Sequence, residues 1–205
     1  MRALSSRNTQ SNIVLRNEID KIRLLFRKNR ESYLCFYRIL GFYPRNIQLY
    51  EQALLHKSTS VRSDKGRPLN NERLEFLGDA ILDAIVGDIV YKRFEGKREG
   101  FLTNTRSKIV QRETLNKLAV EIGLDKLIKY STRSSSHNSY MYGNAFEAFI
   151  GAIIWIRGMN AANSLWNNGS STVISTWIKY PEKRLTSNPN LLSGAKKIRW
   201  RFPLS

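Results

Sequence analysis

The sequence predicts an all-α fold, and three observations support that prediction. Apolar residues recur at three- and four-residue spacing through several long segments, which is the period of an amphipathic helix. Alternating strand patterns are scarce before about residue 153. The chain has 205 residues, of which 41% are hydrophobic, so it can bury a substantial core. We therefore expect a helical domain over most of the chain.

Glycine, proline and polar clusters set the expected limits of the helices. A basic amphipathic helix should end near Gly41, before the helix breaker Pro44. The stretch Ser58 to Pro68 has the composition of a loop, and Glu95 to Gly100 that of a charged turn. The polar stretch Ser131 to Ser139 is a further loop. The expected helices cover about residues 17–40, 48–56, 71–94, 102–122 and 143–156.

The charge balance indicates a polyanionic partner. There are 34 Lys and Arg residues against 17 Asp and Glu, which gives a formal net charge of +17. Nucleic acid is the commonest polyanion, although an anionic membrane or a ribosomal neighbourhood would also fit the charge. No apolar run is long enough for a membrane span, and the first dozen residues lack any hydrophobic run. The single cysteine, Cys35, fits a reducing compartment, so a cytoplasmic protein without membrane contact is expected.

Three acids in the long central helix suggest a metal site. Glu72, Glu75 and Asp79 are spaced i, i+3 and i+7, which places all three on one face of a helix. Like charges repel, so a cation among them would relieve the repulsion, and oxygen ligands suit Mg²⁺ or Mn²⁺. Gly78 is unfavourable in a helix interior and suggests a close approach of another backbone. The alternative is an exposed acidic stripe without a ligand.

A second helix adds Asn144 and Glu147, again spaced i, i+3. In a basic protein, two helices that present oxygen ligands suggest metal-assisted hydrolysis of phosphodiester bonds. No Ser–His–Asp or Cys–His arrangement and no cysteine–histidine set with zinc spacing is found. His56 and His137 are isolated, so structural or surface roles are expected for them.

The segment Asn-Glu-Arg-Leu-Glu-Phe-Leu-Gly-Asp-Ala at residues 71–80 resembles the ribonuclease III signature, which is long and specific. Supporting segments occur in the same order as in that family, and the resemblance covers about residues 17–153. These segments are residues 55–58, the Glu99–Gly100 pair with Leu102, Thr103 and Arg106, and residues 143–152.

The resemblance implies a homodimeric, Mg²⁺-dependent endonuclease domain that cleaves double-stranded RNA, as in the processing of ribosomal and other structured RNA. By position, Glu75, Asp79, Asn144 and Glu147 would bind the metal, and Mn²⁺ would substitute for Mg²⁺. Asp79 and Glu147 would be the catalytic residues. Auxiliary acids would be Glu72 and Glu99, with Glu99 at the cleft formed by the dimer, and Phe76 would contact the partner subunit. RNA-contacting residues are not identified.

Asn144 departs from the family pattern, which usually has Asp at this position. An amide oxygen can still bind Mg²⁺, but one negative charge is lost. A catalytically weak dimer that binds duplex RNA is therefore the alternative to an active enzyme.

The chain divides into a polar extension at residues 1–16, the catalytic domain at 17–156 and an irregular tail at 157–205. All four tryptophans lie after about residue 153, and the final 53 residues hold a single acid, Glu182. The family usually continues into a double-stranded-RNA-binding domain, which the tail does not resemble. With permitted codons, a shifted reading frame yields family-like stretches, so a frameshift near residue 153 is our hypothesis. A poorly folded, inactive product is then a third possibility.

Overall fold

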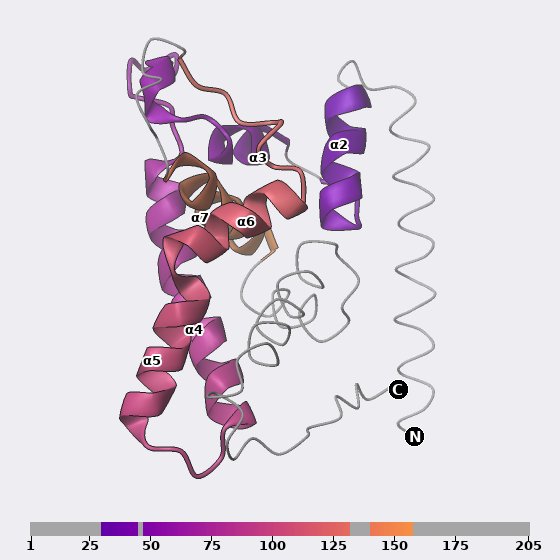
Figure 1. Cartoon of the computed structure of the whole chain (residues 1–205). Helices are drawn as coiled ribbons and strands as arrows, with labels where there is room; N and C mark the ends of the chain where they lie inside the picture. The colour runs from indigo at the N-terminus through magenta and orange to yellow at the C-terminus, as the bar shows by residue number, and fades with distance from the viewer. Residues whose placement is uncertain (1–29, 45–46, 132–139, 158–205) are drawn as a thin grey trace.

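A computed structural model describes residues 30–44, 47–131 and 140–157 of the chain. Helices supply the regular structure of these residues, beside two isolated β-bridges, Leu55–Lys129 and Arg62–Pro68. The predicted all-α fold is confirmed (Figure 1). The helices are α2 (Arg30–Leu40), α3 (Ile47–Ala53), the 3₁₀ turn η1 (Lys57–Thr59), α4 (Glu72–Arg93), α5 (Glu99–Val110), α6 (Arg112–Glu121) and α7 (Met141–Arg157).

The hydrophobic core lies around α7, which packs against α3, α4 and α6. Phe146 and Phe149 of this helix are fully buried, and the buried alanines Ala145, Ala148 and Ala152 beside them allow close helix contact. The ring of Phe149 lies 5.4 Å from that of Tyr50 in α3 and 6.0 Å from that of Phe36 in α2. The apolar sequence of α7 is thus explained by burial on nearly all sides.

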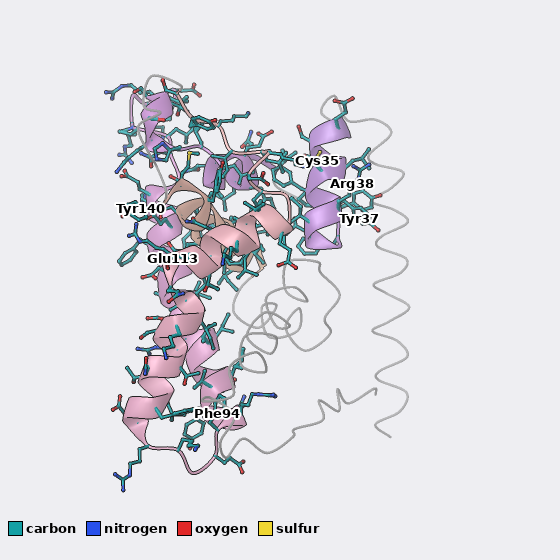
Figure 2. All side chains as sticks on the ribbon, in the orientation of Figure 1. Cys35, Tyr37, Arg38, Phe94, Glu113 and Tyr140 are labelled. Carbon is teal, nitrogen blue, oxygen red and sulfur yellow. The ribbon has the colours of Figure 1, made fainter. Side chains whose placement is uncertain are left out.

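Helices α4 and α5 form a long antiparallel hairpin, and Figure 1 shows them side by side. Gly96 turns the chain between them with a φ of +81°, which a residue with a side chain rarely adopts. Phe94, labelled at the far end of the hairpin in Figure 2, makes an edge contact with Phe101 at 5.1 Å between ring centroids. The hairpin brings the C-terminal end of α5 back to the N-terminal half of α4.

The prediction of a single helix at about 102–122 is wrong, because the helix is interrupted at Gln111. Gln111 has extended backbone angles, with φ −62° and ψ 150°. The two halves pack on different partners: α5 buries Ile109 against α4, whereas α6 buries Leu115 and Leu118 against α7. A straight helix could not reach both partners, and the break makes Arg112 the first residue of α6.

The other helices agree with the sequence to within a few residues, with α4 at 72–93 for a predicted 71–94. Gly41 follows α2 at a φ of +74°, as expected for a residue that ends a helix. The predicted segment 17–29, the loop around His137 and the tail from residue 158 lie outside the described residues. No helix among the described residues is long and apolar enough to cross a membrane.

Candidate active site

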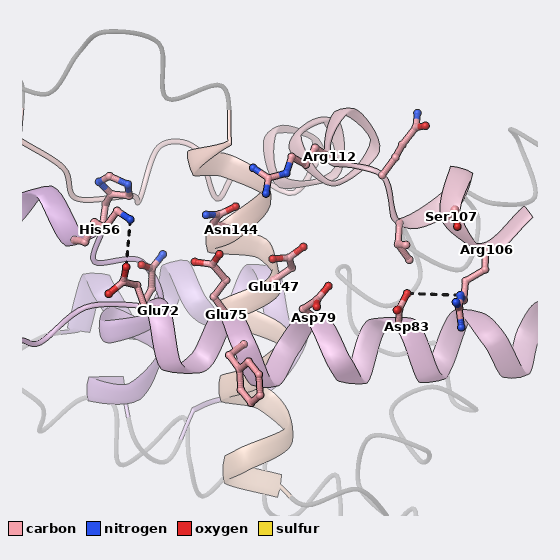
Figure 3. A pocket seen from close by; sticks show the side chains of 15 residues that line it. His56, Glu72, Glu75, Asp79, Asp83, Arg106, Ser107, Arg112, Asn144 and Glu147 are labelled. Carbon is pink, nitrogen blue, oxygen red and sulfur yellow. Dashed lines mark hydrogen bonds and ion pairs between the residues drawn. The ribbon is translucent and has the colours of Figure 1, made fainter. Parts of the chain in front are cut away.

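A row of carboxylates runs along one face of α4. Glu72, Glu75 and Asp79 share that face as their spacing predicts, and Asp83 extends the row by one more turn. All four line one pocket, together with Asn144 and Glu147 from α7 (Figure 3). The two helices whose oxygen-bearing residues the sequence singled out therefore face each other across the same pocket. The remaining lining residues are His56, Lys57, Asn71, Phe76, Arg106, Ser107, Val110, Gln111 and Arg112.

Two glycines hold α4 and α7 in direct backbone contact beneath the pocket. A Cβ atom on Gly78 would lie 1.8 Å from the carbonyl oxygen of Glu147, and one on Gly151 would lie 2.3 Å from that of Leu74. Real Cβ atoms never come so close to another atom, so neither position accepts a side chain unless the helices separate. The close approach predicted from Gly78 is confirmed. Its effect is to fix Glu147 opposite Asp79.

Ion pairs neutralise the two ends of the acidic row. The Lys57 ammonium lies 3.2 Å from a Glu72 carboxylate oxygen, and the Arg106 guanidinium lies 3.8 Å from Asp83. Both pairs are partly exposed to solvent, so they contribute little to stability. The central acids Glu75, Asp79 and Glu147 have no ion pair among the described residues. The negative charge of the pocket is therefore concentrated at its centre.

This concentration of charge changes the acidity of two groups. Burial and the neighbouring carboxylates of Asp79 and Glu75 raise the pKa of Glu147 to about 7. Burial, followed by the charge of Glu72, raises the pKa of Glu75, whereas a hydrogen bond from the Asn144 side chain lowers it. Arg112 lowers both pKa values through its positive charge. Burial and negative charge thus outweigh the positive charge of Arg112 at the centre of the pocket, which favours the binding of a cation there.

The donor set fits a hard divalent cation. Three carboxylates and one side-chain amide supply oxygen atoms of the kind that Mg²⁺ and Mn²⁺ prefer. Among the described residues, however, no three His, Cys, Asp or Glu side chains already converge as a metal cluster. Binding would therefore need side-chain rotation, which the half-buried positions of Glu75 and Glu147 permit.

The other residues that the sequence singled out lie at the rim or outside. Glu72 is paired with Lys57 at one end, and Phe76 projects from the rim with 81% of its surface exposed. Glu99 does not line the pocket: it begins α5 at the far end of the hairpin and accepts a hydrogen bond from Thr103. His56 is buried and bonded to Ser58, which fits the structural role expected for it.

Three cations of the pocket were not predicted as site residues, namely Lys57, Arg106 and Arg112. Lys57 and Arg106 lie in segments that resemble the family, but in a chain with 34 basic residues their spacing alone did not mark them, or Arg112, as site residues. Arg112 in particular reaches the pocket only because the chain breaks at Gln111. The signal that would have identified it is three-dimensional.

The sequence pattern described as ribonuclease-III-like matches residues 46–169, which is more than half of the chain and includes every residue of the pocket. The chain belongs to the ribonuclease III family. The family predicted from residues 71–80 is therefore confirmed, and the acidic pocket lies where α4, which carries that signature, meets α7.

Proteins named ribonuclease 3 are similar to this chain over the same region. The protein from Bacteroides thetaiotaomicron is 92% identical over 145 residues, which are 71% of this chain and 47% of that protein. The protein from Phocaeicola vulgatus is 66% identical over 184 residues, or 88% of this chain and 59% of that protein. The chain thus spans about half the length of the curated relatives it matches.

Solved structures extend the similarity to the fold. The nuclease domain of ribonuclease III from Campylobacter jejuni superposes with a TM-score of 0.58 at 30% identity. The superposition covers 77% of this chain and 97% of that domain. A second structure of that nuclease domain superposes with a TM-score of 0.55 at 30% identity, over 66% of this chain and 91% of that one. That structure is described as flexible in a region involved in dimer formation.

Proposed function

We propose that this ribonuclease III family member is an endoribonuclease that hydrolyses double-stranded RNA with a divalent metal ion, Mg²⁺ or, in its place, Mn²⁺. The observation that carries the proposal is a set of three carboxylates, Glu75, Asp79 and Glu147, beside the Asn144 amide. Within the described part of the chain these carboxylates have no ion pair. A charged cluster that is only partly hydrated is costly unless a ligand compensates it. A divalent cation is the simplest such ligand.

Each residue of the set would have a definite role. Glu75, Asp79, Asn144 and Glu147 would hold the metal, with Asp79 and Glu147 as the catalytic residues next to the reacting phosphate. When bound, the metal would supply an activated water and stabilise the charge that develops on the phosphate. Glu147, whose pKa is about 7, would release its proton when a cation binds. Glu72, held by Lys57, would act as an auxiliary acid at the rim.

Duplex RNA is the substrate class that we infer. The net charge of +17 favours a polyanion, and A-form RNA is recognised by its shape, phosphates and 2′-hydroxyls rather than by its base sequence. Structured precursors such as those of ribosomal RNA, in the cytoplasm, are the expected setting. The free thiol of Cys35 is consistent with a reducing compartment.

An apolar stripe on α4 supports a homodimer. Phe76 and Tyr91 are 81% and 71% exposed, and the alanines Ala80 and Ala84 between them are exposed on the same side of the helix. We call these four residues the α4 stripe. Exposed aromatic side chains along one helix indicate an interface, and a second copy of the chain is the partner we propose.

A twofold axis near the middle of the α4 stripe would also explain the position of Glu99. Two α4 helices that cross antiparallel bring the far end of one hairpin near the acidic row of the other. Glu99 of the partner subunit would then reach the cleft beside this subunit's Glu72 and Glu75. In this arrangement each site is completed by the other protomer.

A cleavage assay on a long RNA duplex tests the proposal. With Mg²⁺, the full chain should cut the duplex to short products, and EDTA should stop the reaction. Glu147→Gln should lower kcat by at least about a hundredfold, because it removes a charged ligand next to the reaction. The matched control is Glu95→Gln, which removes an exposed carboxylate outside the pocket. Cutting that persists in EDTA would refute the proposal.

Asn144 supports one alternative function, a dimer that binds duplex RNA without cutting it. The amide donates a hydrogen bond to Glu75 where family members usually have a carboxylate, so the centre of the pocket carries one charge fewer. The alternative predicts that the wild type binds duplex RNA but does not cut it, and that Asn144→Asp restores cutting. Cutting by the wild type would exclude it.

The tail leaves room for a third outcome, an inactive product of a frameshift near residue 153. The 92% match to the Bacteroides thetaiotaomicron protein includes 145 of the 205 residues, whereas the 66% match to the Phocaeicola vulgatus protein extends over 184 residues. The underlying DNA is the test. If the shifted frame does not encode a sequence similar to the relatives, the frameshift hypothesis is refuted.

A further inference from the structure

Arg112 is the one cation of the pocket that no carboxylate neutralises within the described residues. Lys57 and Arg106 are paired with Glu72 and Asp83, at 3.2 Å and 3.8 Å. Arg112 has no carboxylate oxygen within 4.0 Å and no side-chain hydrogen bond in residues 30–44, 47–131 and 140–157, although it lies close enough to influence the acids. Its guanidinium donors are therefore free for a ligand.

The Arg112 side chain is nevertheless held in place. The carbon of its guanidinium lies 4.1 Å from the ring centroid of Tyr140, just before α7, which is the geometry of a cation–π contact. Its backbone begins α6 directly after the break at Gln111, so the side chain starts from a fixed helix end. In Figure 3 it extends over the pocket on the side of Asn144 and Glu147. A positioned guanidinium without an acceptor is a site for an anion.

Electrostatics indicate which anion this is. An RNA phosphate that enters the pocket meets three carboxylates that have no ion pair with any described residue, and they repel it until positive charge is supplied. A metal ion supplies part of that charge, and Arg112 supplies a charge that belongs to the protein. A planar guanidinium also matches two oxygens of one phosphate, which an ammonium cannot do.

We propose that Arg112 binds the non-bridging oxygens of the scissile phosphodiester of the RNA. The inference rests on the proposed function and adds a residue that touches the substrate. The inference also explains an effect of Asn144. A carboxylate at position 144 would offer the Arg112 guanidinium an acidic partner in the pocket, whereas the neutral amide leaves the guanidinium available for phosphate.

RNA binding is the first test, measured on the full chain with Mg²⁺ over a series of salt concentrations. Every protein in this assay also carries Glu147→Gln, which prevents cutting. We expect Arg112→Gln to weaken binding about ten- to a hundredfold and to lower the salt slope by about one phosphate contact. Arg112→Lys should restore only part of the affinity, since it keeps the charge but loses the planar fork. The control Lys117→Gln removes an exposed charge from the same helix outside the pocket and should change binding far less.

Metal binding separates substrate contact from a supporting role. In calorimetric titration with Mn²⁺ alone, Arg112→Gln should bind at least as tightly as the wild type, because the variant removes a positive charge near the acids. Loss of Mn²⁺ binding would show that Arg112 supports the acids rather than the RNA, and would overturn the inference. So would full recovery of RNA binding by Arg112→Lys. Thermal melts monitored by circular dichroism check that each variant is folded. If Arg112→Gln does not fold, Arg112→Lys is tested in its place. RNA binding by Arg112→Lys that equals binding by the wild type would then overturn the inference.

The outcomes also separate the inference from the proposed function. A wild type that neither binds nor cuts duplex RNA refutes both. A wild type that cuts in Mg²⁺, with Arg112→Gln that binds and cuts equally well, refutes the inference alone. The expected result is cutting by the wild type and a loss of kcat of about tenfold or more in Arg112→Gln.

Discussion

Glu147 links the charge of the pocket to the stability of the fold. Burial and the nearby charges of Asp79 and Glu75 raise its pKa to about 7 from the usual value near 4.5. The folded protein therefore holds the Glu147 proton more tightly than the unfolded chain does. As the pH falls from 7 to 4.5, protonation of Glu147 increasingly stabilises the folded state. Above pH 7 the residue is ionised, and its ionisation then lowers the free energy of unfolding the most.

Glu147→Gln should consequently stabilise the metal-free protein above pH 7 by about 1–2 kcal/mol, a value reduced to allow for solvent screening at this partly exposed group. The difference from the wild type should vanish below about pH 4.5. Urea unfolding in EDTA over this pH range measures it, with Glu95→Gln as the control for the loss of an exposed carboxylate. A stabilisation that is the same at every pH would contradict the assignment of its cause.

At the residue scale, the sequence predicted that Glu72, Glu75 and Asp79 share one face of α4 and that Asn144 and Glu147 share one face of α7. Helix periodicity alone is sufficient for both predictions. Asp83 escaped prediction although it continues the same row, since the signature ends before it. Arg112 could not be predicted, because its position depends on the break at Gln111 and on Tyr140, which is 28 residues further along the chain.

At the element scale, the crossing of α4 and α7 determines whether a site exists at all. Gly78 and Gly151 let the two backbones touch, so a small change in either residue should move Glu147 relative to Asp79. A displacement of about 1 Å at a catalytic group is enough to lower the rate strongly. If Glu147 and Asp79 are the catalytic residues that we propose, the two glycines would affect the rate only through the geometry of the helix crossing.

Gly78→Ala should destabilise the fold by about 3 kcal/mol or more, since its Cβ would lie 1.8 Å from a backbone oxygen that cannot move alone. Gly87→Ala is the matched control on the same helix. Its Cβ would meet only the Arg106 side chain, at 4.0 Å, so this variant should be neutral or more stable by up to about 1 kcal/mol. Thermal and urea unfolding at one protein concentration measures both. Equal stability of the two variants would contradict the close contact.

The break between α5 and α6 shows why element limits are harder to predict than elements. Residues 102–122 contain no Gly or Pro, and their apolar spacing suits one continuous helix. The two halves nevertheless pack on different helices, α4 and α7, and burial of both apolar faces outweighs one lost turn of helix. Competition of this kind depends on tertiary contacts, which local propensity does not contain.

At the scale of the whole molecule, the acidic pocket is exceptional on a strongly basic chain. The net charge of +17 favours a polyanion such as the RNA that we propose, while the carboxylates concentrate negative charge where a metal would bind. Composition predicted the first property and the signature predicted the second. The orientation of the basic residues, and hence the path of the RNA across the surface, depends on the complete assembly.

That assembly provides the last prediction. Phe76 is 81% exposed at one end of the α4 stripe, and a twofold interface over the stripe would bury this side chain once in each subunit. Phe76→Ala should therefore weaken the dimer at least about thirtyfold, as measured by sedimentation velocity over a concentration series. Val120→Ala, an exposed apolar residue on α6 outside the stripe, is the control and should leave the dimer intact.

The same variant tests whether the two sites depend on each other. If Glu99 of the partner subunit completes the cleft, cutting by Phe76→Ala should fall in proportion to the loss of dimer and recover at high protein concentration. A wild type that sediments as a monomer yet cuts duplex RNA would contradict the interface and the shared cleft together. A dimer that persists in Phe76→Ala would place the interface elsewhere than on the α4 stripe.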